Sequence, residues 1–196
     1  MPPKRPPPPP PLRLLIGSSK GGVGKTTLAA HLARLLSADL YDLDPERGTR
    51  ALTDHGLRIH VQAEPPRPQP GERIVLDVPA NQANNAGVLG RAAATATHIL
   101  VPCLPGDLEV DRLENTLRVL KAAGARAKIG VVLNRAGRDN TTLETLEALH
   151  ALPDLVGVPF AVLGSLPNTV RFPRALVNGF AGGTLDEFGE VLKWLA

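Results

Sequence analysis

Short apolar runs alternate along the chain with segments whose apolar residues recur at helical spacing. The runs predict strands at Leu12–Ile16, Asp39–Leu43, Leu57–Ala63, Arg73–Val78, His98–Cys103, Lys128–Leu133 and Leu155–Phe160. The helical spacings predict helices at Lys25–Ser37, Thr49–His55, Asn84–Ala94, Asp107–Ala123, Thr141–Leu149, Thr169–Val177 and Thr184–Leu195. This alternation favours an α/β fold, with a doubly wound, mostly parallel sheet flanked by helices.

The first eleven residues, Met1–Pro11, differ from this pattern because they read MPPKRPPPPPP. Proline lacks a backbone N–H, so we expect a flexible polyproline II tail outside the fold. It is either an unstructured leader or a docking motif for a proline-binding partner. Residues 12–196 have the length of one domain.

Composition narrows the class of protein. Aromatic residues make up 3% of the chain and hydrophobic residues 43%, so the core must consist of Leu, Val, Ile and Ala. The single cysteine, Cys103, excludes a disulfide or a cysteine-built metal site within one chain. No apolar run reaches the roughly 18 residues of a membrane span, and no signal-peptide core is present. We therefore expect a cytoplasmic protein without a membrane partner.

The strongest motif is the glycine-rich segment SSKGGVGKTT, Ser18–Thr27, which lies between a predicted strand and a predicted helix. Backbone N–H groups at a helix N-terminus bind phosphates, and glycines allow the close approach that this needs. The segment predicts an ATP and Mg²⁺ site, with Lys25 on the β- and γ-phosphates and the Thr26 hydroxyl on Mg²⁺. The full set of nucleotide-binding candidates in this loop is Gly21, Gly22, Val23, Gly24, Lys25, Thr26 and Thr27.

An extra lysine, Lys20, precedes the glycines and gives KGGVGKT. This sequence resembles the deviant Walker A family, which includes the ParA and MinD ATPases. The resemblance implies that Lys20 crosses a dimer interface to the nucleotide of the other subunit. It therefore implies a homodimer that forms with ATP, and a catalytic role for Lys20 beside Lys25.

Two acidic motifs follow in the order that this family shows. DLDPERG resembles its first switch segment, which implies that Asp44 positions the attacking water and that Asp42 belongs to the metal environment. IVLDVPA resembles its Walker B segment, which implies that Asp77 holds Mg²⁺ through water. Phosphoryl transfer needs such an oriented nucleophile and such charge neutralisation. The resemblance implies an ATP hydrolase, producing ADP and phosphate, whose weak basal activity a partner stimulates.

Two later segments extend the resemblance. VVLNRAG ends in an Asn-Arg pair, which implies that Asn134 reads the adenine edge. LPNTVRFPRALVNG is similar to a late family stretch, which implies that Pro167 lies near the base.

Among family members, the chain looks most like a small ParA without an N-terminal helix-turn-helix domain. That resemblance implies a nucleoid-associated ATPase for plasmid or chromosome segregation, with nonspecific double-stranded DNA and a ParB-like centromere-binding protein as partners. Positioning of a protein cargo shares every motif and stays open. A MinD-like or metallochaperone ATPase is the other alternative, although the acidic C-terminal segment TLDEFGEVLKWLA is unlike a basic membrane helix.

Candidate DNA contacts come from the arginines. Arg171 and Arg174 lie about one helical turn apart in Gly164–Gly183, a stretch without acidic residues. Arg135 and Arg138 are second candidates. They belong to a basic region, Arg112–Arg138, in which Glu114 is the one acidic residue. The alternative is that these arginines cap helices or form ion pairs within the fold.

Overall fold

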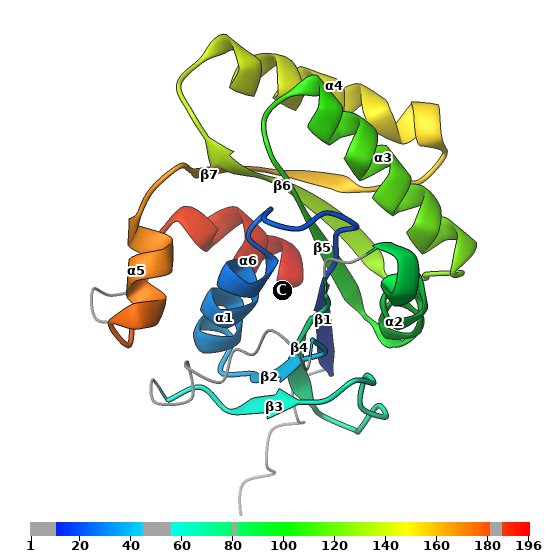
Figure 1. Ribbon diagram of the computed structural model, residues 1–196, viewed down its shortest axis with the longest axis vertical. Coiled ribbons are helices and arrows are strands. Elements are labelled where there is room, and N and C mark those ends of the chain that lie inside the picture. Colours follow the sequence, from blue (N-terminus) through cyan, green and yellow to red (C-terminus); the bar gives the residue numbers. More distant parts are fainter. Residues whose placement is uncertain (1–10, 45–55, 80–81, 181–185) are drawn as a thin grey trace, which may run out of the picture.

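A single sheet runs through the molecule, with helices on both of its faces (Figure 1). The computed structural model describes residues 11–44, 56–79, 82–180 and 186–196, with residues 82–86 described by their backbone alone. All strand pairs in these parts of the chain are parallel. This architecture confirms the predicted doubly wound α/β fold.

The strand order indicates which edge of the sheet carries the functional site. The order is β3-β2-β4-β1-β5-β6-β7. The strands are β1 (Leu12–Ile16), β2 (Asp39–Asp42), β3 (Ile59–Val61), β4 (Arg73–Asp77), β5 (His98–Cys103), β6 (Lys128–Ala136) and β7 (Ala161–Pro167). The early strands lie on one side of β1 and the later ones on the other, so the order reverses at β1. Ligands of such sheets bind at the carboxyl ends of the strands beside this reversal.

Two layers of helices form two separate cores. One face carries α1 (Lys25–Leu35), α5 (Arg171–Val177), the 3-10 helix η2 (Asp186–Phe188) and α6 (Gly189–Leu195); the other carries α2 (Gln82–Thr95), α3 (Asp107–Ala122) and α4 (Asn140–Val156). Successive strand residues point to opposite faces. Leu14 and Ile16 accordingly pack against α1, whereas Leu15 packs in the core under α2, α3 and α4. Both faces of β1 are therefore buried, which explains its uninterrupted burial.

The predicted strand Leu155–Phe160 is wrong. Helix α4 continues through Pro153 to Val156 and ends at Gly157, whose φ of 60° is left-handed. Leu149, Leu152 and Val156 share one buried face at helical spacing, and this packing outweighs the helix-breaking tendency of proline near the last turn. The last strand is β7, which begins five residues beyond Val156.

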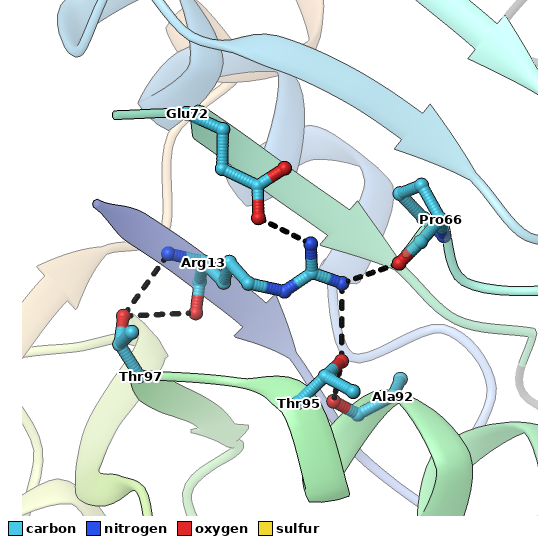
Figure 2. Close-up of polar contacts among 6 residues, drawn as sticks. All are labelled: Arg13, Pro66, Glu72, Ala92, Thr95 and Thr97. Atoms are coloured by element: carbon cyan, nitrogen blue, oxygen red, sulfur yellow. Dashed lines mark hydrogen bonds and ion pairs between the residues drawn. The ribbon is translucent and has the colours of Figure 1, made fainter. Parts of the chain in front are cut away.

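A buried arginine fixes the opposite, amino edge of the sheet (Figure 2). Arg13 is in β1, and its guanidinium contacts Glu72 Oε1 at 2.5 Å, the Pro66 carbonyl at 2.8 Å and Thr95 Oγ1 at 3.0 Å. Its backbone N–H donates to Thr97 Oγ1 at 3.0 Å. The side chain of Arg13 therefore ties Pro66, Glu72 and Thr95 together at this edge, and its backbone adds Thr97.

Several predictions lie wholly or partly outside the described residues. These are the tail Met1–Pro11, apart from Pro11 itself, the helix Thr49–His55 and the first two residues of the helix Thr184–Leu195. The described remainder of that last helix is η2 followed by α6. Among the described residues, no helix has both the length and the apolar character of a membrane span.

Candidate nucleotide-binding site

The glycine loop lies where β1 ends and α1 begins, at the carboxyl edge of the sheet. Gly24 is the N-cap of α1, with a left-handed φ of 94°. A β-carbon at this position would lie 2.5 Å from Asn134 Nδ2, so glycine is required both by conformation and by space. Gly22 also has a left-handed φ, of 77°. The predicted strand–loop–helix context of the phosphate loop is confirmed.

The first turn of α1 is prepared for an anion. It contains Lys25, Thr26 and Thr27 and no acidic residue. The N–H groups of a first helical turn have no partner within the helix, and the helix dipole adds positive potential there. Gly21 and Gly22 are exposed at the mouth of the loop. These features fit a phosphate chain.

Lys25 is buried, and its side chain contacts the glycine loop. Its Nζ donates to the Lys20 carbonyl at 2.7 Å. Burial lowers the pKa of Lys25, while the nearby Asp77 and Asp44 carboxylates act in the opposite direction. An added phosphate would bring negative charge to this ammonium group and favour its charged form.

Two carboxylates end adjacent strands opposite Lys25. Asp42 of β2 and Asp77 of β4 are buried and stand directly across from each other in the strand register. Burial raises the pKa of Asp77 to about 7, and the Asp42 and Asp44 charges add to this, against a hydrogen bond from Thr26 and the charge of Lys25. Among the described residues, Asp77 Oδ1 has no hydrogen-bond partner.

These groups fit a Mg²⁺ ion. A divalent cation would favour the ionised form of the buried Asp77 carboxylate, and Mg²⁺ takes oxygen ligands and retains several waters. The Thr26 hydroxyl, Asp42 and Asp77 are the side chains that would surround it. Asp44 follows β2, and its backbone N–H donates to Asp42 Oδ1 at 2.9 Å, which holds Asp44 at the same edge.

The extra lysine forms an ion pair within its own chain. Lys20 Nζ lies 2.6 Å from Glu109 Oε1, near the start of α3, and Arg112 binds the same carboxylate oxygen. The side chain of Lys20 is 28% exposed and that of Glu109 is 13% exposed. Glu109 lies before the basic region that begins at Arg112, and its partner Lys20 is 89 residues away, so the charge pattern of the sequence does not indicate this pair.

Asn134 and Pro167 lie at the same edge of the sheet. Asn134 is buried in β6, and its Nδ2 donates to the Val23 carbonyl of the glycine loop at 2.8 Å. Pro167 ends β7 and pairs in register with Ala136 of β6. The structure thus gives Asn134 a contact with the loop itself, while its contact with adenine and that of Pro167 stay predictions.

The candidate DNA-binding arginines occupy two places. Arg171 and Arg174 are exposed on α5, and Arg171 Nη1 pairs with Glu187 Oε1 of η2 at 2.9 Å. Glu187 lies beyond the acid-free stretch that the sequence singles out, so the local composition did not indicate this pair. Arg135 and Arg138 are exposed near the end of β6.

A buried histidine links α5 to α1. His31 Nε2 lies 3.0 Å from the Phe172 carbonyl, and the ring packs among Phe172, Phe180 and Phe188 at centroid distances of 5.6, 5.2 and 5.6 Å. Burial lowers its pKa. His31 is therefore a packed core residue, and it attaches the helix that carries Arg171 to the helix that follows the glycine loop.

Comparison with known proteins agrees with this geometry. The model of the CobQ/CobB/MinD/ParA nucleotide binding domain family matches residues 14–179. Among curated proteins, none matches this chain.

Solved structures share the fold. A plasmid partition protein from Borrelia burgdorferi bound to AMPPNP is similar with a TM-score of 0.68 and 16% identity, over 93% of this chain and 97% of that one. A ParA family ATPase from Chlorobium tepidum has a TM-score of 0.61 and 14% identity, over 95% and 98%. The MinD cell division protein of Aquifex aeolicus has a TM-score of 0.61 and 17% identity, over 86% and 87%.

Proposed function

Because the chain belongs to the CobQ/CobB/MinD/ParA family of nucleotide-binding domains, we propose that it is a ParA-type ATPase that dimerises on ATP and binds DNA without sequence preference. In this proposal a ParB-like centromere-binding partner stimulates hydrolysis, and the cycle segregates a plasmid or chromosome on the nucleoid, in the cytoplasm. The observation that carries it is the pair of lysines in the glycine loop: a buried Lys25 directed into the loop and a partly exposed Lys20 beside it.

The chemistry follows from the carboxyl edge of the sheet. Backbone N–H groups of the loop and Lys25 bind the phosphates, and Thr26, Asp42 and Asp77 surround Mg²⁺. That ion supplies neutralisation of phosphate charge when it is bound. Asp44 orients the attacking water. Lys20 leaves Glu109 and reaches the nucleotide of the second subunit, so the site is complete only in the dimer.

DNA binding would use exposed arginines. Nonspecific affinity comes from phosphate contacts and the release of counterions, which needs exposed cations rather than base readout. Arg174 is exposed on α5, and Arg171 joins it once its pair with Glu187 opens. Because His31 packs α5 against α1, Arg171 and Arg174 lie on a helix that contacts the helix following the glycine loop.

The proposal is tested by measuring binding to two unrelated duplexes across a salt series, with ATP and with ADP. We expect ATP-dependent binding of equal affinity for both duplexes. Binding that ignores the nucleotide, or a marked preference for one duplex, would contradict the mechanism. A protein that dimerises on ATP yet ignores DNA would instead be a cargo-positioning, MinD-like or metallochaperone-like ATPase, and one that neither dimerises on ATP nor hydrolyses it would contradict the proposal as a whole.

A further inference from the structure

A hydroxyl group of α3 holds the glycine loop just before its extra lysine. Thr116 is almost fully buried, and its Oγ1 accepts a hydrogen bond from the backbone N–H of Ser19 at 3.2 Å. The two hydroxyl oxygens of Ser19 and Thr116 lie 2.9 Å apart. Thr116 Oγ1 also donates to the Arg112 carbonyl at 3.0 Å.

The hydrogen count defines the direction of these bonds. A threonine hydroxyl has one hydrogen and two acceptor sites. Since Thr116 gives its hydrogen to the Arg112 carbonyl, it accepts both the N–H and the O–H of Ser19. The single hydrogen and both acceptor sites of the buried Thr116 Oγ1 are then used in hydrogen bonds. The bond to Arg112 is common for helical threonines, whereas the two bonds from Ser19 come from a segment 97 residues away.

The same face of α3 also binds Lys20, the loop residue that follows Ser19. Glu109 and Thr116 are seven residues apart and therefore lie on one side of the helix. Glu109 pairs with the side chain of Lys20, and Thr116 fixes Ser19 before it. The far half of the loop has a different anchor, because Asn134 binds the Val23 carbonyl. The loop is thus held by α3 at its lysine end and by β6 at its phosphate end.

We propose that Thr116 is a positioning residue for the ATPase reaction: through Ser19 it sets the place of Lys20. This inference rests on the proposed function, in which Lys20 reaches the second subunit. When Lys20 leaves Glu109, its side chain is free, and the bonds from Ser19 to Thr116 still fix the backbone from which the side chain extends. Catalytic groups lose much of their effect when displaced by about 1 Å.

The inference separates binding from turnover. In the proposed function ATP is bound by residues 21–27, whereas the hydrogen bonds of Thr116 go to Ser19 and Arg112. Loss of the Thr116 hydroxyl is therefore expected to leave nucleotide affinity in place. Turnover and ATP-dependent dimerisation need a correctly placed Lys20. Removing the acceptor at position 116 is therefore expected to lower kcat roughly tenfold while the affinity for ATP changes by less than about twofold.

Four variants test this. Thr116→Val removes the hydroxyl at constant shape, and Thr116→Ser restores it. Ser19→Ala removes the hydroxyl on the loop side of the same contact. Because Ser19 is only half-buried, we expect this variant to fold. Thr142→Val is the matched control, because Thr142 is also a buried threonine that accepts a backbone N–H, from Gly137 at 3.0 Å. The readouts are binding of a fluorescent ATP analogue, phosphate release and light scattering with ATP and Mg²⁺.

We expect low kcat with retained ATP affinity for Thr116→Val, a smaller loss for Ser19→Ala, recovery in Thr116→Ser and wild-type kinetics for Thr142→Val. In a Lys20→Ala background, Thr116→Val should have no further effect on kcat. Equal losses of kcat and ATP affinity, or full additivity with Lys20→Ala, would overturn the positioning role. A wild-type protein that neither dimerises nor hydrolyses ATP would overturn the proposed function instead.

Discussion

Replacing Glu109 by Gln should tighten ATP-dependent dimerisation. In the single chain, Lys20 is bound to Glu109 at 2.6 Å, and in the proposed dimer the same lysine must reach the other subunit. The ion pair therefore stabilises the monomer. Glutamine keeps the shape of the side chain and removes its charge. It therefore weakens the contact with Lys20 while no residue of the glycine loop is replaced.

The size of the effect follows from the burial of the pair. A hydrogen bond to a charged group contributes about 1.5–3 kcal/mol when buried, and an exposed ion pair contributes about 0.2–1 kcal/mol. Side chains that are 28% and 13% exposed lie between these limits, at about 1.5 kcal/mol. A dimer that breaks two such pairs loses about 3 kcal/mol, which is roughly 100-fold in the dissociation constant. Because glutamine retains part of the hydrogen bond, we expect a gain of roughly 10- to 100-fold.

Analytical ultracentrifugation with Mg²⁺ and the nonhydrolysable analogue AMPPNP measures this constant without turnover. Glu114→Gln is the matched control, since Glu114 forms an ion pair with Arg118 on the same helix and away from the loop. We expect Glu114→Gln to dimerise as the wild type does. If Glu109→Gln dimerises no more tightly than this control, the ion pair does not oppose the dimer and the reasoning fails.

Three further predictions concern the site and its surroundings. Asp44→Ala should bind ATP but hydrolyse it poorly, whereas Lys25→Ala should lose nucleotide because a charged phosphate contact disappears; filter binding and phosphate release separate the two. Without Mg²⁺, Asp77 should lower stability as the pH rises from about 4 to about 7, because its folded pKa of about 7 exceeds the ordinary 3.8 and the folded state binds the extra proton. Asp77→Asn should therefore melt at a higher temperature than the wild type at pH 8 in EDTA and at a similar one near pH 4; equal melting at pH 8 would contradict this. Arg174→Ala should flatten the slope of log affinity against log salt by roughly 0.9 for each phosphate contact that is lost, and Arg171→Ala by less because Glu187 competes for Arg171. An unchanged slope for Arg174→Ala would remove α5 from the DNA surface.

The sequence predicts those parts of the fold that depend on neighbouring residues. The mostly apolar run LRLLI and the loop KGGVGKT carry their structure locally, since a strand buried on both faces needs mainly apolar residues and the loop needs glycine at Gly24. The charged residue of that run, Arg13, is buried through contacts with residues far away in the sequence. The strand prediction for Leu155–Phe160 is wrong because a short apolar run fits the end of a buried helix as well as a strand. The sequence does not predict the contacts of Glu109 and Thr116 for another reason: their partners in the loop are 89 and 97 residues away. Only the packing of α3 against the loop brings them together.

The Arg13 cluster has a practical consequence for watching the protein at work. Arg13 fastens both ends of the segment 66–72 to the sheet at the edge opposite the glycine loop, while residues 67–71 are exposed. A fluorophore or short epitope placed at Gln69 would therefore be attached to a rigid part of the protein and remote from nucleotide. Its orientation would report the tumbling of the whole subunit. Polarised single-molecule imaging of this label could then test whether a subunit joins and leaves the proposed dimer.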